Sequence, residues 1–296
     1  MKIAIAGGSG LVGSALIPIL QSHGNQITRL VRSSPKPGEI EWHPNQDKVS
    51  ALSLEGFETI INLAGENIAG GRWTDDQKRK IRDSRMNGTH LLSEAIAQMK
   101  SKPRVFICAS ATGIYGDRDD ETLDEQSESG GGFLAGVCRE WEQATEPASK
   151  AGVRVVNLRM GPILARDGGM LSKLLTPFKM GMGGKVGSGK QYISWVALED
   201  AVNAIKLAID DESIRGPINI VSPNPVTNEE FTKTLGHVLN RPTALAMPAF
   251  AARLAFGEMA DEMLLASQKV MPKRLIQAGF QFQYPTLESA MRKYVG

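Results

Sequence analysis

Short apolar runs rich in β-branched residues alternate with longer amphipathic stretches through the first half of the chain. The runs with the length and composition of buried strands are residues 3–6, 26–31, 59–63, 104–109 and 153–158. The stretches with helical spacing between them are residues 11–22, 74–100 and 133–150. Such alternation is typical of right-handed crossovers that cover both faces of a parallel sheet with helices. The pattern therefore predicts an α/β fold with a doubly wound parallel sheet.

The pattern changes after Gly161. Residues 167–189 are rich in glycine, which predicts a loop-rich excursion. A helix over 199–210 and a strand over 218–221 follow, and from Pro223 onward short helical segments are separated by prolines. The later part of the chain is therefore predicted to form a smaller, mostly helical lobe.

The length of 296 residues accommodates one large α/β domain and a smaller lobe. We place the α/β domain at residues 1–165, with residues 190–221 returning to it. Residues 166–189 and 222–296 then form the smaller C-terminal lobe.

The composition is that of an ordinary water-soluble protein, with 42% hydrophobic and 22% charged residues. The formal net charge is only +2 and the densest basic run, residues 78–82, is followed by Asp83, so we expect no nucleic-acid partner. No apolar run approaches the roughly 20 residues that span a bilayer. The chain also opens with a strand rather than a secretory signal, so we expect a cytoplasmic protein with no membrane partner.

The two cysteines, Cys108 and Cys138, and the four histidines show no metal-ligand spacing. We therefore predict no metal site. Because nothing points to an oxidising compartment, we also expect no structural disulfide.

A glycine-rich segment follows the first predicted strand and opens the first predicted helix. Gly7, Gly10 and Gly13 have the spacing GxxGxxG: the first permits a tight turn, the second lets the backbone approach a pyrophosphate, and the third lets helix and strand pack closely. The helix N-terminus offers unpaired N–H groups and a partial positive charge to phosphates. This context predicts a Rossmann domain that binds a dinucleotide. The predicted contacts on this segment are Gly7, Ser9, Gly10, Leu11, Val12 and Gly13.

The end of the second predicted strand bears on the choice between NAD and NADP. An NAD site usually places a carboxylate there, which accepts a hydrogen bond from the ribose 2′-hydroxyl. No acidic residue occurs between Gln26 and Gly38, and Arg32 is followed by Ser33 and Ser34. An arginine and hydroxyl groups suit a 2′-phosphate, so we predict NADP(H) with Arg32 on that phosphate. The alternative is that Arg32 is an ordinary solvated loop residue.

Several further motifs resemble those of an extended short-chain dehydrogenase/reductase. They are Asn62-Leu63-Ala64-Gly65, Asn87-Gly88-Thr89, Ser110-Ala111-Thr112-Gly113-Ile114-Tyr115-Gly116, Arg159-Met160-Gly161-Pro162, and Trp195-Val196 with Asp200. Other motifs narrow the resemblance to the subgroup of epimerase family proteins, which has its own C-terminal domain. These are Ala64-Gly65-Glu66-Asn67-Ile68, Phe133-Leu134-Ala135 with Cys138 and Trp141-Glu142, Gly181-x-Gly183-Gly184 with Gly187-Ser188-Gly189, Phe256-Gly257-Glu258-Met259 and Ser267-Gln268-Lys269-Val270-x-Pro272. The resemblance implies an NADP-binding protein with an epimerase-like fold.

The resemblance extends the expected cofactor site beyond the glycine segment. It implies that Leu63, Ala64 and Gly65 lie along the adenosine side, and that Met160 also contacts the cofactor. Arg85 precedes the Asn87-Gly88-Thr89 motif on a helix that should pass near the nicotinamide side. There it would neutralise phosphate, the alternative being a solvated helix charge.

The proton-transfer pair of the wider family is missing from this sequence. That pair is Tyr-x-x-x-Lys on a helix, where the lysine charge lowers the tyrosine pKa and suits the phenol to acid–base work. None of the four tyrosines is followed by a lysine four positions later. Whether Phe133 or Leu134 stands at the tyrosine position, the lysine position holds Val137 or Cys138.

Three hydroxyl groups are the candidates for substrate chemistry in place of that pair. Ser110 and Thr112 follow a predicted strand at its carboxyl end, where open α/β sheets bind ligands. Gly113 resembles a one-residue insertion, so either hydroxyl could face the substrate. Tyr115 supplies the nearby phenol. The alternative, given equal weight, is that Tyr115 is a packed residue with a hydrogen-bonded hydroxyl and has no catalytic role. Cys138 is expected to be a small buried apolar group rather than a nucleophile.

Two functions are consistent with the sequence. The first is an NADP(H)-dependent oxidoreductase or epimerase-like enzyme that acts on a small polar metabolite, for example a nucleotide-linked sugar. The second is a non-catalytic NADP(H)-binding redox sensor or regulatory protein, which the missing Tyr/Lys pair favours. A homodimer is expected only by analogy with extended members of the family.

Overall fold

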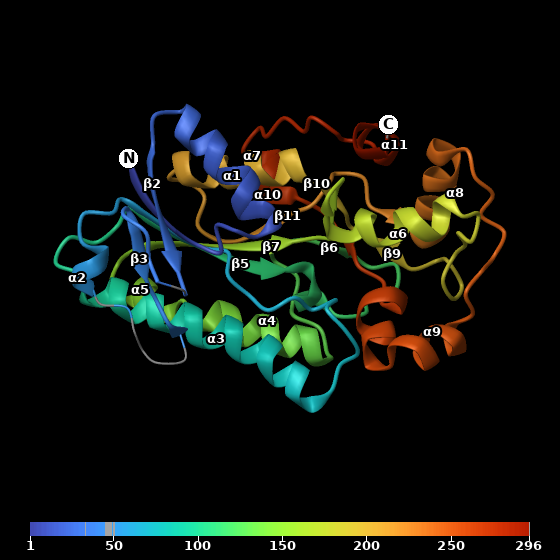
Figure 1. The fold of residues 1–296 in the computed structure, drawn as a ribbon, viewed down its shortest axis with the longest axis horizontal. Coiled ribbons are helices and arrows are strands. Elements are labelled where there is room, and N and C mark those ends of the chain that lie inside the picture. Colours follow the sequence, from blue (N-terminus) through green and yellow to red (C-terminus); the bar gives the residue numbers. More distant parts are fainter. Residues whose placement is uncertain (33, 45–48, 50, 296) are drawn as a thin grey trace. The chain divides into compact units, whose positions relative to one another are not determined.

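The computed structural model describes residues 1–32, 34–44, 49 and 51–295 (Figure 1). Ser33, one of the two serines predicted beside the cofactor phosphate, lies outside the described residues. The described chain forms two compact units, of which the first consists of Met1–Ser110, Val137–Leu158 and Ile205–Ile218. The second consists of Ala111–Gly136, Arg159–Ala204 and Asn219–Gly296. It takes in residues 111–136, 159–165, 190–204 and 219–221, which we had expected in the first domain.

A seven-stranded sheet forms the centre of the α/β fold, which confirms the predicted fold class. Its order is β11-β7-β5-β4-β1-β2-β3. The bounds of these strands are β1 Lys2–Ala6, β2 Gln26–Val31, β3 Glu39–Glu41, β4 Thr59–Asn62, β5 Val105–Ala111, β7 Arg154–Met160 and β11 Gly216–Ile220. Strand β1 pairs in parallel with β2 on one side and with β4 on the other. Because both of its faces are covered, β1 is apolar without alternation and Ile3 to Ala6 are fully buried.

Helices cover both faces of the first unit's sheet. In Figure 1, α3 (Asp75–Gln98) and α5 (Glu146–Lys150) run along one face and α1 (Leu11–Ser22) along the other. Thr74 caps α3 by accepting a hydrogen bond from the N–H of Gln77, and two aspartates follow in its first turn. The short helix α2 (Ala51–Leu54) precedes β4.

One predicted helix is two helices in the structure. The stretch 133–150 consists of α4 (Phe133–Gln143) and α5, so the prediction of one continuous helix was wrong. Pro147 has no N–H to continue the ladder of hydrogen bonds, and its ring disfavours a helix through the residues before it. It is instead accommodated in the first turn of α5.

The glycine-rich stretch 167–189 is not all loop, which corrects a second prediction. Helix α6 (Gly169–Lys179) occupies its first half. Leu171 and Phe178 are buried, and Leu174 and Leu175 are partly buried between them, so the apolar residues follow helical spacing. The glycines flank this helix and obscured it in the sequence.

The remaining elements of the second unit are short. Its strand pairs are β6 (Thr122–Leu123) with β13 (Lys269–Val270), β8 (Ile163–Ala165) with β10 (Val196–Ala197), and β9 (Tyr192–Ile193) with β12 (Val226–Thr227). Its helices are α8 (Asn228–Leu239), α9 (Ala249–Phe256), α10 (Lys273–Gln277) and α11 (Leu287–Val295), with the 3₁₀ turn η2 (Thr112–Tyr115) and the π-helix η3 (Ala260–Leu265). Helix α7 (Leu198–Asp210) begins in this unit and ends in the first.

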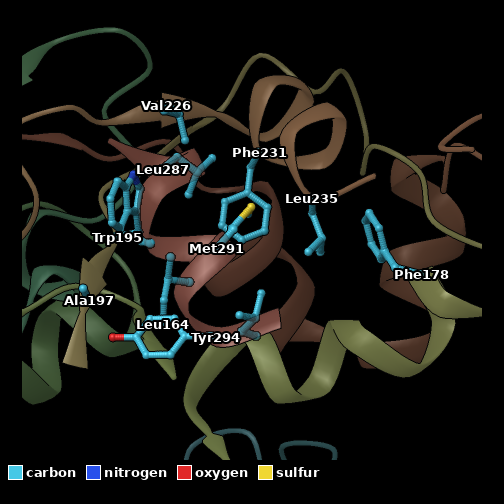
Figure 2. Packing of buried hydrophobic residues seen from close by; sticks show 12 residues of the cluster. Leu164, Phe178, Trp195, Ala197, Val226, Phe231, Leu235, Leu287, Met291 and Tyr294 are labelled. Atoms are coloured by element: carbon cyan, nitrogen blue, oxygen red, sulfur yellow. The ribbon is translucent and has the colours of Figure 1, made fainter. Parts of the chain in front are cut away.

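A separate apolar core holds the second unit together. Figure 2 shows Trp195, Phe231 and Met291 packed with residues from β8, α6, α8 and α11. Trp195 is fully buried and donates a hydrogen bond to the carbonyl of Asn224, so it is a packing residue. Among the helices that the structure describes, none has the length and apolarity that crossing a membrane requires.

Candidate functional site

The three glycines of the first turn differ in the space that a side chain would have at each position. Gly7 has φ +78°, and a Cβ there would lie 2.5 Å from the carbonyl carbon of Leu63. A Cβ on Gly13 would lie 2.4 Å from the oxygen of Gly7, so α1 packs directly on the turn. At Gly10, by contrast, the nearest atom to a Cβ would be the Gly7 oxygen at 3.4 Å. Gly7 and Gly13 are therefore required by packing, whereas Gly10 faces open space.

Gly10, with this open space beside it, lies at the start of α1. Gly10 is the N-cap and offers no side chain to the first N–H groups of the helix. Ser9 is exposed, Leu11 is partly buried and Val12 is buried in the first turn. The segment thus leaves backbone donors and the positive end of α1 accessible to an anion such as a pyrophosphate.

Two arginines lie at the end of β2. Arg32 is exposed, while the Nε atom of Arg29 is buried and has no hydrogen-bond partner among the described residues. That Nε would be 3.5 Å from a Cβ on Gly8, so Arg29 lies beside the glycine turn. The Arg29 guanidinium pairs with Glu39 through Nη1 at 3.6 Å, so its orphaned Nε is the donor that suits a phosphate acceptor. We missed Arg29 in the sequence, although its place in β2, three residues before Arg32, was a usable signal.

The turn after β4 packs against Gly7 and is shaped by a buried asparagine. The Asn62 Oδ1 accepts a hydrogen bond from the N–H of Ala64 at 3.1 Å, which shapes the turn. Its Nδ2 donates to the Thr89 hydroxyl at 2.9 Å. The turn places Leu63, Ala64 and the exposed Gly65 at the carboxyl end of β4, next to β1. In a sheet of this order the chain changes direction between these two strands, and ligands bind in the crevice that results.

The Thr89 hydroxyl joins three motifs that are far apart in the sequence. It accepts from Asn62 and from the Trp141 Nε1, which is 2.9 Å away. With both acceptor positions used, its own proton points to the Cys108 sulfur at 3.4 Å. Burial raises the pKa of the Cys108 thiol to about 12, so this thiol stays protonated. Both Cys108 and Cys138 are buried, and neither forms a disulfide.

Arg85 lies on α3 with its guanidinium over α4. Its Cζ is 5.0 Å from the centroid of the Trp141 ring, a cation–π contact. A Cβ on Gly65 would lie 3.3 Å from the same Cζ, so the guanidinium also packs against the turn after β4. Burial lowers the pKa of Arg85 from its ordinary value, although arginine stays charged in this setting. This packed position of Arg85 differs from that of a solvated charge on the helix surface, which was the alternative prediction for this residue.

Ser110 ends the first unit at the carboxyl end of β5. The residue is 2% exposed, and its hydroxyl donates a hydrogen bond to Glu142 of α4 at 2.7 Å. The carboxylate orients this hydroxyl, and the oxygen keeps a free lone pair for a second donor.

The other two hydroxyl candidates belong to the second unit. Thr112 begins the turn η2 and is buried. Tyr115 is fully buried, accepts a hydrogen bond from Arg159 at 3.0 Å, and lies within hydrogen-bond distance of Asn219 Oδ1 and the Asp124 carbonyl. Burial raises the pKa of Tyr115, against the lowering effect of Arg159. This environment resembles the packed, hydrogen-bonded tyrosine that was the alternative in the sequence. Met160 ends β7 in the same unit and is partly buried.

The start of α4 has a cap that the sequence did not reveal. The Glu262 carboxylate, from the π-helix η3, accepts hydrogen bonds from the N–H groups of Phe133 and Leu134 at 2.9 and 3.0 Å. An anionic cap also complements the helix dipole. The partners are more than a hundred residues apart, so no local pattern signals the contact.

Comparison with known proteins identifies the family. The model of the NAD dependent epimerase/dehydratase family matches residues 3–221. The chain belongs to this family. A domain of unknown function, DUF1731, matches residues 247–294, which hold the Glu262 cap. Together the two matches confirm the resemblance inferred from the motifs.

Individual members of the epimerase/dehydratase family resemble the chain over its whole length. An epimerase family protein of Mycobacterium leprae is 43% identical over 290 residues, which cover 98% of this chain and 94% of that protein. The crystal structure of human epimerase family protein SDR39U1 with NADPH has a TM-score of 0.92 at 31% identity and covers 99% of both chains. A crystal structure described as the nucleoside-diphosphate sugar epimerase from Corynebacterium glutamicum has a TM-score of 0.84 at 40% identity, covering 100% of this chain and 58% of that chain.

Proposed function

We propose that the protein binds NADP(H) and is an oxidoreductase or epimerase-like enzyme of a small polar metabolite. The observation that carries the proposal is the accessible N-terminus of α1 at Gly10, beside the arginines of β2. The glycine turn accommodates a pyrophosphate, and the arginines supply donors for a further phosphate.

The arginines favour NADP(H) over NAD(H). Arg32 is exposed at the end of β2, and the buried Nε of Arg29 has no partner among the described residues. A 2′-phosphate at this place would satisfy both. The human relative SDR39U1, which was crystallised with NADPH, supports the same choice.

For the substrate we propose a nucleotide-linked sugar, the class named for the Corynebacterium glutamicum relative. A bound nicotinamide supplies or accepts a hydride. Ser110 and Thr112 are our candidates for contact with the substrate oxygen. The hydroxyl of Tyr115 already has protein partners, so we propose that it supports the second unit rather than transferring a proton.

Titration with NADPH and NADH tests the cofactor. We expect NADPH to bind more tightly, and Arg32→Ala and Arg29→Met each to weaken NADPH while leaving NADH unchanged. Equal affinity for both nucleotides, unaffected by either substitution, would show that the assignment to NADP(H) is wrong.

A redox sensor is the second candidate, because none of the four tyrosines belongs to a Tyr-x-x-x-Lys pair. The protein loaded with NADPH or NADP⁺ is mixed with a panel of nucleotide sugars and simple carbonyl compounds, and nicotinamide absorbance and sugar products are followed. Turnover that Ser110→Ala reduces, at unchanged stability, supports the enzyme. Tight cofactor binding without turnover across the panel supports the sensor.

A further inference from the structure

Helix α4 carries no cation where the wider family resemblance places a lysine. The two residues that can occupy that position, Val137 and Cys138, are 3% and 4% exposed. Neither side chain supplies a positive charge or a strong hydrogen-bond donor. A cofactor bound along this helix would therefore meet no positive charge at this position of α4.

Arg85 reaches the same face of α4 from α3. Cys138 and Trp141 are three residues apart on α4 and so lie on one face of the helix. The Arg85 guanidinium covers the Trp141 ring at 5.0 Å and interacts electrostatically with Cys138. The positive charge that α4 lacks is thus present beside it, on a neighbouring helix.

The guanidinium of Arg85 is not saturated by the protein. One N–H donates to the carbonyl of Ile81 at 3.0 Å, and the remaining donors have no acceptor among the described residues. Arg85 is partly exposed and borders Gly65, which is exposed. Its Nη1 and Nη2 atoms would each lie 3.5 Å from a Cβ on Gly65, so both nitrogens border this exposed turn.

The strand order places Arg85 in one half of the expected cofactor site. The adenosine half of a dinucleotide lies over β1, β2 and β3 and the nicotinamide half over β4 and β5, with the change of direction between β1 and β4. Helix α3 follows β4 in the chain, and α4, which carries Trp141, comes after β5; both strands lie on the other side of β1 from β2. We therefore place Arg85, and the Gly65 that it borders, in the nicotinamide half rather than on the adenosine side expected for Gly65 from the sequence, whereas Arg32 belongs to the adenosine half.

We propose that Arg85 binds the nicotinamide-side ribose or phosphate and supplies, from α3, the positive charge that a lysine on α4 supplies in members with the Tyr/Lys pair. The proposal rests on the proposed NADP(H) binding. Arginine does not release its proton near neutral pH, so Arg85 positions the cofactor and is not the acid or base.

Fragment binding separates this role from the adenosine-side contacts. The dissociation constants of NADPH and of adenosine 2′,5′-bisphosphate are measured for the full-length protein and for Arg85→Met. We expect NADPH to bind about tenfold to a hundredfold more weakly, as for loss of charge-assisted hydrogen bonds. Affinity for the bisphosphate should be unchanged, and Arg32→Ala should weaken both ligands.

Two further variants test whether position and charge are what matters. Arg82→Met removes an exposed arginine of the same helix, paired with Glu140 at the surface, and should change neither constant. Arg85→Met/Cys138→Lys returns a cation to α4 in the space vacated by Arg85 and should restore at least part of the NADPH affinity.

Three outcomes would overturn the proposal: unchanged NADPH affinity in Arg85→Met, an equal loss for the bisphosphate at unchanged thermal stability, or no rescue by the lysine. If the unsubstituted protein binds neither ligand, the proposed cofactor itself is wrong, which is a distinguishable result.

Discussion

Gly10 and Gly13 are three residues apart in one turn, yet substitution by alanine should lower the stability at Gly13 and the NADPH affinity at Gly10. Gly13→Ala places a methyl group 2.4 Å from the Gly7 oxygen and 2.7 Å from the Gly8 Cα. Both obstacles are backbone atoms and cannot rotate away. Gly10→Ala places a methyl group 3.4 Å from its nearest neighbour, and Gly10 has φ −75°, which alanine adopts readily.

The geometry sets the size of each effect. At Gly13 the contact must lengthen by 1.0 Å, from 2.4 to 3.4 Å, before it is an ordinary one. Overpacking of this kind costs about 1–3 kcal/mol, and the helix preference for alanine returns up to about 1 kcal/mol. We therefore expect the free energy of unfolding of Gly13→Ala to fall by about 1–2 kcal/mol.

At Gly10, substitution by alanine has two small and opposite effects on the free energy of unfolding. Alanine is a poorer N-cap than glycine, but it restricts the unfolded chain, and the net change should be within about 0.5 kcal/mol. The new methyl group stands where a pyrophosphate would approach the backbone. NADPH affinity should therefore fall about tenfold or more, equivalent to about 1.4 kcal/mol.

Urea unfolding followed by circular dichroism measures the stabilities, and NADPH fluorescence titration measures the affinities. Gly10→Ala is expected to lose affinity at nearly unchanged stability, whereas Gly13→Ala is expected to lose stability. Wild-type NADPH affinity in Gly10→Ala would refute the pyrophosphate site at this turn. Wild-type stability in Gly13→Ala would refute the packing argument.

Three further predictions concern the buried contacts. Thr89→Val should lower the free energy of unfolding, measured in urea, by about 2–4 kcal/mol, because the donors of Asn62 and Trp141 lose their acceptor. Thr89→Ser keeps the hydroxyl and should retain most of the wild-type stability. Equal losses in the two variants would contradict the role of the hydroxyl. The Cys108 thiol, with its pKa raised to about 12, should resist alkylation in the folded protein. The protonated thiol contributes fully to the free energy of unfolding below about pH 8.5, and this contribution declines as the pH rises toward 12, because the thiol of the unfolded chain ionises first. Rapid labelling of Cys108 in the native protein, located by mass spectrometry, would contradict the prediction. Glu262→Ala should destabilise the start of α4 by about 1–2 kcal/mol, seen as faster hydrogen exchange in its first turn, whereas unchanged exchange would argue against the cap.

Local patterns predicted the elements whose causes are local. Helix α1 has the bounds predicted for it, because a glycine turn precedes it and its apolar face is periodic. Helix α6 was missed because the flanking glycines outweighed an apolar stripe of only a few residues. The break between α4 and α5 was missed although Pro147 marks it, because the apolar spacing continues across the break.

The candidate site was predictable only where a single segment carries it. The glycine turn and Arg32 each belong to one stretch of chain, and their chemistry follows from residue type and spacing. The hydrogen bonds that join Asn62, Thr89 and Trp141, and the cap of α4 by Glu262, connect segments far apart in the sequence. No periodicity or short motif records such pairings, because they depend on how the elements pack.

The sequence by itself thus determined an α/β fold of the epimerase/dehydratase family, a glycine turn with the spacing of a phosphate-binding segment and the absence of a Tyr-x-x-x-Lys pair. These follow from periodicity, glycine spacing and residue identity, which are properties of single segments. Only the tertiary structure decided that Arg85 faces α4 rather than solvent and that Tyr115 lies in a saturated hydrogen-bond network. A side chain's partners are set by the packing of its helix or strand against others, and that packing is a property of the whole fold.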